Sequence, residues 1–280
     1  MKWFKLTFNL GNVIATTKFS LVYLALIVFS LTTMSFTDPL NNHAGIVSIS
    51  DSTISKDSAA FKGLSDKSVD EINPDDVQLN PQAVSFVQEY VQKQGEELER
   101  MKVWAKPYFA IYDNILSSFG IPKQMKYLSV IESHLERGLV SWAGAVGPWQ
   151  IMPDEAKKYG LHKSRSVDER TDFAKSTAVA AQLMKELYGK FGDWLLVVAA
   201  YNCGAGGVRK AIRKAGSRDF WALQNYLPAE TRNHVKKFIG THYIFEGGGG
   251  ITTMTAAETE ARKFEVSLRR TSQQLASVGG

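Results

Sequence analysis

The stretch YLSVIES, residues 127–133, decides how this sequence is interpreted. Leu128, Ile131 and Leu135 are three and four residues apart, which places them on one apolar stripe of a predicted helix. Glu132 comes four residues after Leu128 and lies at the edge of that stripe. A carboxyl group in this position is partly desolvated, which favours its protonated form, as a general acid requires. A surface glutamate beside a core stripe has the same local pattern, so this stretch alone leaves both interpretations open.

Helical periodicity continues on both sides of this stretch. Apolar residues recur every three or four positions after Pro81, and Gly120 together with Pro122 ends that region. Strand patterns are almost absent, so we expect a mainly α fold. The predicted helices cover residues 123–136, 153–159, 171–189, 193–202, 206–215 and 229–243.

A loop rich in glycine and tryptophan, SWAGAVGPWQIMP at 141–153, follows the first of these helices. Glycine lets the backbone approach a ligand closely, and tryptophan faces suit the apolar faces of sugar rings. The Gln150 amide can both donate and accept hydrogen bonds. The loop therefore predicts a saccharide groove. A tight turn with Trp142 and Trp149 in the core is the alternative.

A third polar segment, AYNCGAGG at 200–207, ends an apolar helix with a glycine-rich turn. This turn would direct Tyr201 and Asn202 at whatever lies beyond the helix end. Asparagine beside such a turn is also common for backbone reasons, so the segment is weak evidence by itself.

In this order, the three segments resemble the catalytic domain of the lytic murein transglycosylases, glycoside hydrolase family 23. The shared motifs are Glu-Ser, Gly-x-x-Gly-x-x-Gln and Ala-Tyr-Asn. The resemblance extends through GDWLL at 192–196 and YLPAETR at 226–232, where the membrane-bound D branch is most similar. It covers roughly residues 100–245 and implies an SLT-like helical domain related to goose-type lysozyme, that is, an α+β lysozyme-like fold.

The family activity that this resemblance implies is a carbon–oxygen lyase reaction on peptidoglycan, without a cofactor. Glu132 would be the single acid/base. It would protonate the β-1,4 bond between N-acetylmuramic acid and N-acetylglucosamine, then deprotonate the muramoyl C6 hydroxyl to leave a 1,6-anhydro end. The residues expected to line the substrate groove around it are Ser133, Ser141, Gln150, Tyr201 and Asn202.

Three positions depart from the family pattern. Pro148-Trp149 stands where many relatives have Leu-Met or Leu-Trp, and Cys203 takes a position usually filled by Ala or Ser. His234 stands where the Glu-Thr-x-x-Tyr pattern ends in Tyr. The last departure removes the tyrosine hydroxyl that the predicted helix at 229–243 would otherwise present.

Hydrolysis of the same bond is the nearest alternative, and it usually takes two carboxylates. No Asp or Glu occurs between Glu136 and Asp154, and Glu136, one predicted turn after Glu132, would point along the solvent edge. A goose-type lysozyme-like hydrolase would need Asp168 or Asp172 to position a water. We expect these two instead to cap the next helix and form ion pairs. An inactive peptidoglycan-binding scaffold is the alternative from another class.

The composition fits one folded core with extensions. The chain has 280 residues and a net charge of +5, which suits an acidic partner: nucleic acid, an anionic membrane surface or the carboxylate-bearing cell wall. Cys203 is the single cysteine, so no intramolecular disulfide can form, and no Cys/His cluster has metal-ligand spacing. We expect a monomer without a metal. The basic run from Arg209 to Arg218 fits a solvated helix face better than a nucleic-acid site.

The N-terminus has the features of an export signal. Lys2, Lys5 and Lys18 precede the apolar run at 19–31, which could extend to Phe36 as an uncleaved anchor in the inner membrane. This order of charge and hydrophobic run sends the following residues into the periplasm. The expected division is a signal peptide or anchor at 1–36, a polar linker at 37–80, the catalytic domain at 81–246, and a glycine-rich break with a polar tail at 247–280, which could include one solvated helix.

Overall fold

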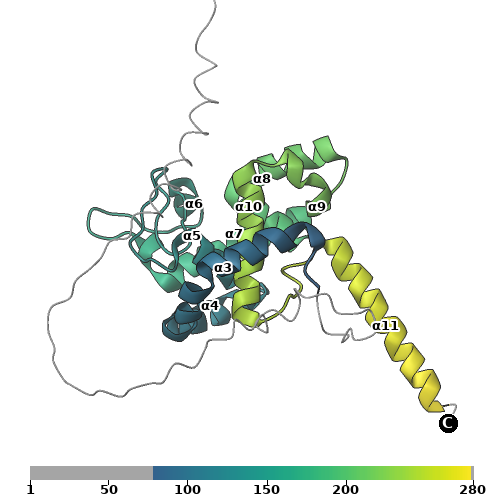
Figure 1. Ribbon diagram of the computed structural model, residues 1–280. Coiled ribbons are helices and arrows are strands. Elements are labelled where there is room, and N and C mark those ends of the chain that lie inside the picture. Colours follow the sequence, from purple (N-terminus) through teal and green to yellow (C-terminus); the bar gives the residue numbers. More distant parts are fainter. Residues whose placement is uncertain (1–77, 279–280) are drawn as a thin grey trace, which may run out of the picture. The chain divides into compact units, whose positions relative to one another are not determined.

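The computed structural model describes residues 78–278, shown as the coloured ribbon in Figure 1. The predicted signal at 1–36 and nearly all of the linker lie outside the described residues. All described residues belong to one compact unit, Lys56–Gly280. None of the helices within 78–278 combines the length and the apolar character needed to cross a membrane.

The prediction of a mainly α fold is confirmed, because helices connected by loops make up the described residues. Extended backbone pairs there only at isolated antiparallel bridges. The longer helices are α3 (Pro81–Trp104), α4 (Lys106–Ser118), α7 (Phe173–Phe191), α8 (Trp194–Ala215), α10 (Ala229–Glu246) and α11 (Ala256–Val278). The shorter ones are η4 (Lys123–Lys126), α5 (Tyr127–Ser133), α6 (Pro153–Lys158), η5 (Glu169–Thr171), α9 (Phe220–Leu223) and η6 (Gln224–Tyr226).

Helix α10 packs against α3, α5 and α8, and Figure 1 shows α3 crossing it. Val235, Phe238 and Ile239 place an apolar face of α10 in the core. Gly240 lets α10 approach α3 closely, because a Cβ atom there would lie 2.6 Å from a ring carbon of Tyr90 in α3. Since α10 also contacts α5, this packing fixes the helix that carries Glu132.

Helices α7 and α8 form a connected pair whose ends follow local signals. Asp172 caps α7 by accepting a hydrogen bond from the Lys175 amide at 2.8 Å, and Asp193 caps α8 through the Leu196 amide at 3.0 Å. Inside α8 the backbone breaks at Gly204, where φ is 75° and ψ is 154°. The break falls between the two predicted helices 193–202 and 206–215.

Helix α5 is shorter than predicted. It ends at Ser133 because His134 and Leu135 both adopt left-handed backbone angles, with φ of 51° and 65°. The prediction that Leu135 continues the helical stripe is therefore wrong, although its side chain is buried. Glu136 does not lie one helical turn after Glu132, and its side chain is exposed.

The first residues of α11, which follows α10, form hydrogen bonds with the rest of the unit. The Ala256 amide donates to Oδ2 of buried Asp193 at 2.7 Å. Glu258 accepts hydrogen bonds from Asn80 at 2.6 Å and from the Trp221 indole at 3.3 Å. Helix α11 therefore starts within the folded unit, whereas its later residues, including Phe264, are exposed.

Candidate active site

Glu132 lies in the last turn of α5, where its side chain is 16% exposed. Leu128 on the same helix is fully buried, and Ile131 is partly buried against the core. The carboxyl group is therefore partly withdrawn from water, as the apolar stripe predicts. Because its side chain is not fully covered, a ligand can still reach it.

His234 of α10 makes an ion-pair contact with this carboxyl group. Its Nε2 atom lies 3.2 Å from Oε1 of Glu132, and its side chain is 10% exposed. The same Nε2 is buried and makes no hydrogen bond within the described residues. The two groups are close enough for an ion pair when the imidazole is protonated.

Two further glutamates experience the charge of Glu132. Burial raises the pKa of Glu155 in α6, and the negative charge of Glu132 raises it further, while a hydrogen bond from the Met152 amide at 3.1 Å opposes the shift. Burial also raises the pKa of Glu230 in α10, against the effects of His234 and Asn202. The site thus gathers three carboxyl groups and one imidazole.

Tyr201 and Asn202 come from the end of the first part of α8. Burial raises the pKa of Tyr201 well above its ordinary value, with Glu155 and Glu132 adding to the shift. Its hydroxyl donates to the Trp149 carbonyl oxygen at 2.8 Å. The Asn202 side-chain oxygen accepts a hydrogen bond from Thr231 at 2.6 Å. These contacts join α8 to the glycine-rich loop and to α10.

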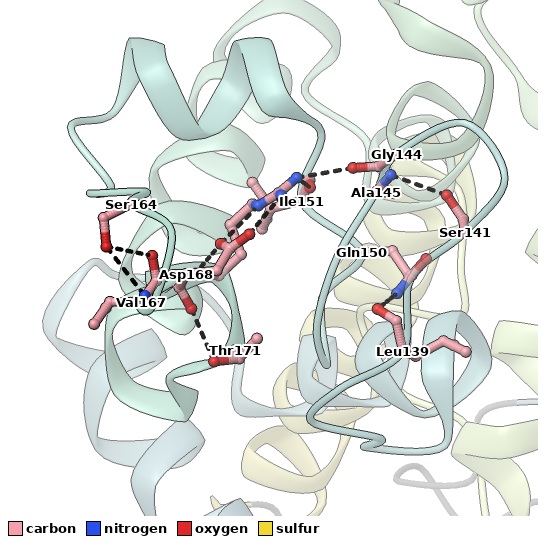
Figure 2. Close-up of polar contacts among 11 residues, drawn as sticks. Leu139, Ser141, Gly144, Ala145, Gln150, Ile151, Ser164, Val167, Asp168 and Thr171 are labelled. Atoms are coloured by element: carbon pink, nitrogen blue, oxygen red, sulfur yellow. Dashed lines mark hydrogen bonds and ion pairs between the residues drawn. The ribbon is translucent and has the colours of Figure 1, made fainter.

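The glycine-rich loop is held in a left-handed backbone at three positions. Gly144 and Gly147 have φ of 84° and 82°, and Gln150 has φ of 48°. The Gln150 side chain donates to the Gly147 carbonyl oxygen at 2.9 Å, and the Ser141 hydroxyl accepts from the Ala145 amide at 2.9 Å. Figure 2 shows Ser141 bonded to Ala145 within the loop, and the Gln150 side chain bonded to the Leu139 carbonyl oxygen just before the loop. Their nearest polar partners are thus parts of the loop itself.

Arg170 connects this loop to η5. Its buried guanidinium donates to the carbonyl oxygens of Gly144 at 2.8 Å and Ile151 at 3.2 Å, and Asp168 pairs with it at 2.6 Å (Figure 2). The ion pair holds the pKa of Asp168 below its ordinary value. The prediction that Asp168 and Asp172 are structural is confirmed, since one pairs with Arg170 and the other caps α7.

Two predicted features of the groove differ from the structure. Ser133 is buried, and its hydroxyl donates to the Pro148 carbonyl oxygen at 2.8 Å, so it fastens the loop to α5. Trp149 is fully buried and donates from its indole to Thr177 at 2.8 Å. Trp149 therefore belongs to the core and has no face for a sugar ring, whereas Trp142 is 69% exposed.

Residues 117–224 match the family described as the transglycosylase SLT domain. The chain is similar to this family over that range. The matched range includes all six sequence-predicted site residues, from Glu132 to Asn202. Glu230 and His234 lie beyond it.

Two relatives match part of this chain. Membrane-bound lytic murein transglycosylase D of Escherichia coli strain K12 is 37% identical over 164 residues, which are 56% of this chain and 36% of that protein. A putative tributyltin chloride resistance protein of Alteromonas sp. strain M-1 is 33% identical over 133 residues, which are 47% of this chain and 64% of that protein. The chain thus spans about a third of the length of the first protein and less than two thirds of the length of the second.

Among solved structures, the 70 kDa soluble lytic transglycosylase of Escherichia coli is similar to this chain at 22% identity. The match covers 63% of this chain and 32% of that one, with a TM-score of 0.48.

Sequence reasoning missed two members of the site, Glu155 and Glu230. Glu155 stands three residues after Met152 and accepts from its amide, so its pattern is that of a helix-start glutamate. Glu230 lies in the YLPAETR segment, which carries no local sign of burial. His234 was visible in the sequence only as a departure from the family pattern. Within residues 78–278, no three His, Cys, Asp or Glu side chains are grouped to hold a metal ion.

Proposed function

We propose that this chain is a peptidoglycan lytic transglycosylase in which Glu132 is the single acid/base. The observation that carries the proposal is the partly buried Glu132 carboxyl group, next in the chain to Ser133, whose hydroxyl donates to the Pro148 carbonyl oxygen of the loop. The similarity of residues 117–224 to the transglycosylase SLT domain supports it. A carboxyl group that is shielded yet reachable can exist in both the protonated and the charged form during one reaction cycle.

In the proposed reaction Glu132 transfers its proton to the oxygen of the β-1,4 bond, and the bond between C1 of the muramoyl sugar and that oxygen breaks. The Glu132 carboxylate then takes the proton of the C6 hydroxyl, and the C6 oxygen bonds to C1. The enzyme regains the proton that it gave, and no water is consumed. An attacking group on the same sugar also reacts without the entropic cost of bringing in a second molecule.

The predicted groove residues would contribute in different ways. Asn202, held by Thr231, and Trp142, which is largely exposed, are suited to contact the glycan. Gln150 has a side-chain oxygen to offer, since its amide nitrogen bonds to the loop. Ser133 and Ser141 would act on substrate through the shape of the loop that they hold. Tyr201 would support the loop from beneath Trp149.

A goose-type hydrolase remains the second candidate because of one observation. Glu155 is close enough to Glu132 for the charge of one carboxylate to act on the other. A second carboxyl group near the acid is the arrangement that hydrolases use to activate a water. Its hydrogen bond to the Met152 amide favours a structural role instead.

The proposed location is the periplasm. The basic and apolar order of residues 1–36 supports export, and a relative is named as membrane-bound. We propose residues 81–246 as the catalytic domain of a monomer, preceded by a linker at 37–80. Protease treatment of cells with a permeabilised outer membrane and an intact inner membrane tests this location. Digestion of the domain is expected, and its protection would contradict export.

Mass analysis of muropeptides after digestion of purified sacculi tests the activity. A lytic transglycosylase releases 1,6-anhydro-muropeptides, each lighter by one water than the lysozyme product. Reducing ends as the main product would assign the chain to the hydrolases. No released product, with binding to sacculi retained, would assign it to the inactive scaffolds.

A further inference from the structure

The pairing of Glu132 with a histidine places a second titratable group at the acid. Oε1 of Glu132 and Nε2 of His234 lie 3.2 Å apart, and both side chains are mostly buried. Nε2 has no hydrogen bond elsewhere within the described residues, so Glu132 is its nearest ion-pair partner. The separation of 3.2 Å is within hydrogen-bond range.

Charged and titratable groups that act on the pair come from several elements. Helix α6 contributes Glu155 and α8 contributes Tyr201, both of which experience the charge of Glu132. On α10 itself, Glu230 interacts with both His234 and Lys237. On α3, which packs against α10, Tyr90 bonds to Thr241, and on η6 Gln224 bonds to Gln82 of α3.

We infer that Glu132 and His234 share a single proton, which makes His234 a positioning residue for the acid. The proton resides either on Nε2, which leaves a charged ion pair, or on the carboxyl group, which leaves both partners neutral. This inference rests on the proposed function, because the shared proton is the one given to the glycosidic oxygen. Since Glu132 recovers a proton from the C6 hydroxyl, the pair ends each cycle with the one proton it began with.

The expected consequence is a wider pH range of activity. An ordinary glutamate loses its proton near pH 4.3 and an ordinary imidazole near pH 6.5. Two coupled groups lose their protons in two steps that belong to the pair, and the one-proton form is populated between them. Activity should therefore persist up to the second step, where the shared proton is lost. A neutral residue in place of His234 would leave only the first step.

The first experiment compares pH profiles of anhydro-muropeptide release by the wild-type full chain and its His234→Gln variant. The glutamine amide can still donate to Glu132 but does not titrate. We expect the alkaline limb of the variant to move down by about one pH unit or more, so that activity on that limb, relative to the variant's own optimum, falls about tenfold or more. A profile with an unchanged alkaline limb, whatever its height, would overturn the inference. His162→Gln is the matched control, since His162 is exposed.

A second experiment does not depend on activity or on the folding of the His234 variant. The ring signals of the five histidines are followed by NMR over pH in the wild type and in Glu132→Gln. Coupling predicts that the NMR response of the His234 ring, and of no other histidine, changes in the variant. Identical titration in both proteins would overturn the shared proton. Coupled titration together with reducing ends in the sacculus digest would retain the pair and overturn the transglycosylase proposal instead.

Discussion

The carbonyl oxygen of Arg170 lies so close to Gly147 that a Cβ atom at position 147 would be 2.1 Å from it. The guanidinium of the same arginine donates to the carbonyl oxygens of Gly144 and Ile151. Arg170 therefore holds the loop through its backbone on one side and its side chain on the other. The second glycine of the Gly-x-x-Gly-x-x-Gln motif is required by this contact, in addition to its left-handed backbone.

Gly147→Ala should destabilise the protein by about 3 kcal/mol or more, because the added methyl group both clashes and is strained. Gly144→Ala is the matched control. Its φ of 84° is nearly the same, but the nearest atom to an added Cβ is Pro153 Cγ at 3.7 Å. Strain alone should then cost about 1–2 kcal/mol. Urea unfolding measures both, and equal losses would show that the Arg170 contact is unimportant.

Glu132→Gln should lower the release of anhydro-muropeptides by at least about 100-fold, because glutamine keeps the shape of the side chain but cannot give and regain a proton. The urea midpoint and binding to sacculi should change little. Glu136→Gln serves as the control, since Glu136 is exposed beyond the end of α5. Comparable losses in the two variants, with both folds intact, would exclude the single-carboxylate mechanism.

Glu155→Gln separates the two candidate reactions. Because its carboxyl group accepts from the Met152 amide, glutamine can replace that hydrogen bond, and the anhydro product should persist. If Glu155 instead activates a water, the wild type will release reducing ends and this variant will lose them. Mass analysis of the digest distinguishes these results in a single experiment.

His242 should make folding sensitive to mild acid. Burial lowers the pKa of His242 from 6.5 to about 4 in the folded state, and Nδ1 is bonded to the Gly248 carbonyl oxygen at 3.0 Å. Between these two values the unfolded chain binds the proton and the folded chain does not, so stability falls as pH drops from about 6.5 to about 4, by about 3 kcal/mol in all.

The variant His242→Asn tests this dependence, because the asparagine amide can still donate to Gly248 but does not titrate. Its urea midpoint should fall less than that of the wild type between pH 7 and pH 5. His162→Asn, at an exposed position, should leave the wild-type pH dependence in place. Equal slopes in all three proteins would assign the acid sensitivity to other groups.

Truncation after Glu246 should destabilise the protein by about 1–3 kcal/mol, although the predicted catalytic domain ends there. The cut removes the Ala256 amide from buried Asp193 and removes Glu258 from Asn80 and Trp221. Truncation after Glu265 is the control, since it keeps these contacts and removes exposed helix. Thermal unfolding compares the two, and equal midpoints would show that residues 247–265 do not support the fold.

Local features of this chain could be read from its sequence. The periodicity of apolar residues predicted the helices at 153–159 and 229–243 closely, because it depends only on neighbours in the chain. The roles of Asp168 and Asp172 followed from short-range capping and pairing. The early end of α5 could not be predicted from the sequence, because left-handed backbone angles at His134 and Leu135 are rare for such residues and have no signal in the composition.

The site was only partly determined by sequence. The order of the sequence motifs indicated Glu132 and the glycine-rich loop as parts of the site. That order does not show which of the side chains face inward. Trp149 and Ser133 turned out to be buried because the loop folds over α5 and α7, a packing arrangement set by distant residues. The contact between Glu132 and His234 was likewise decided by tertiary structure, since it depends on where α10 crosses α5, and helix periodicity fixes the face of each helix but not the distance between two of them.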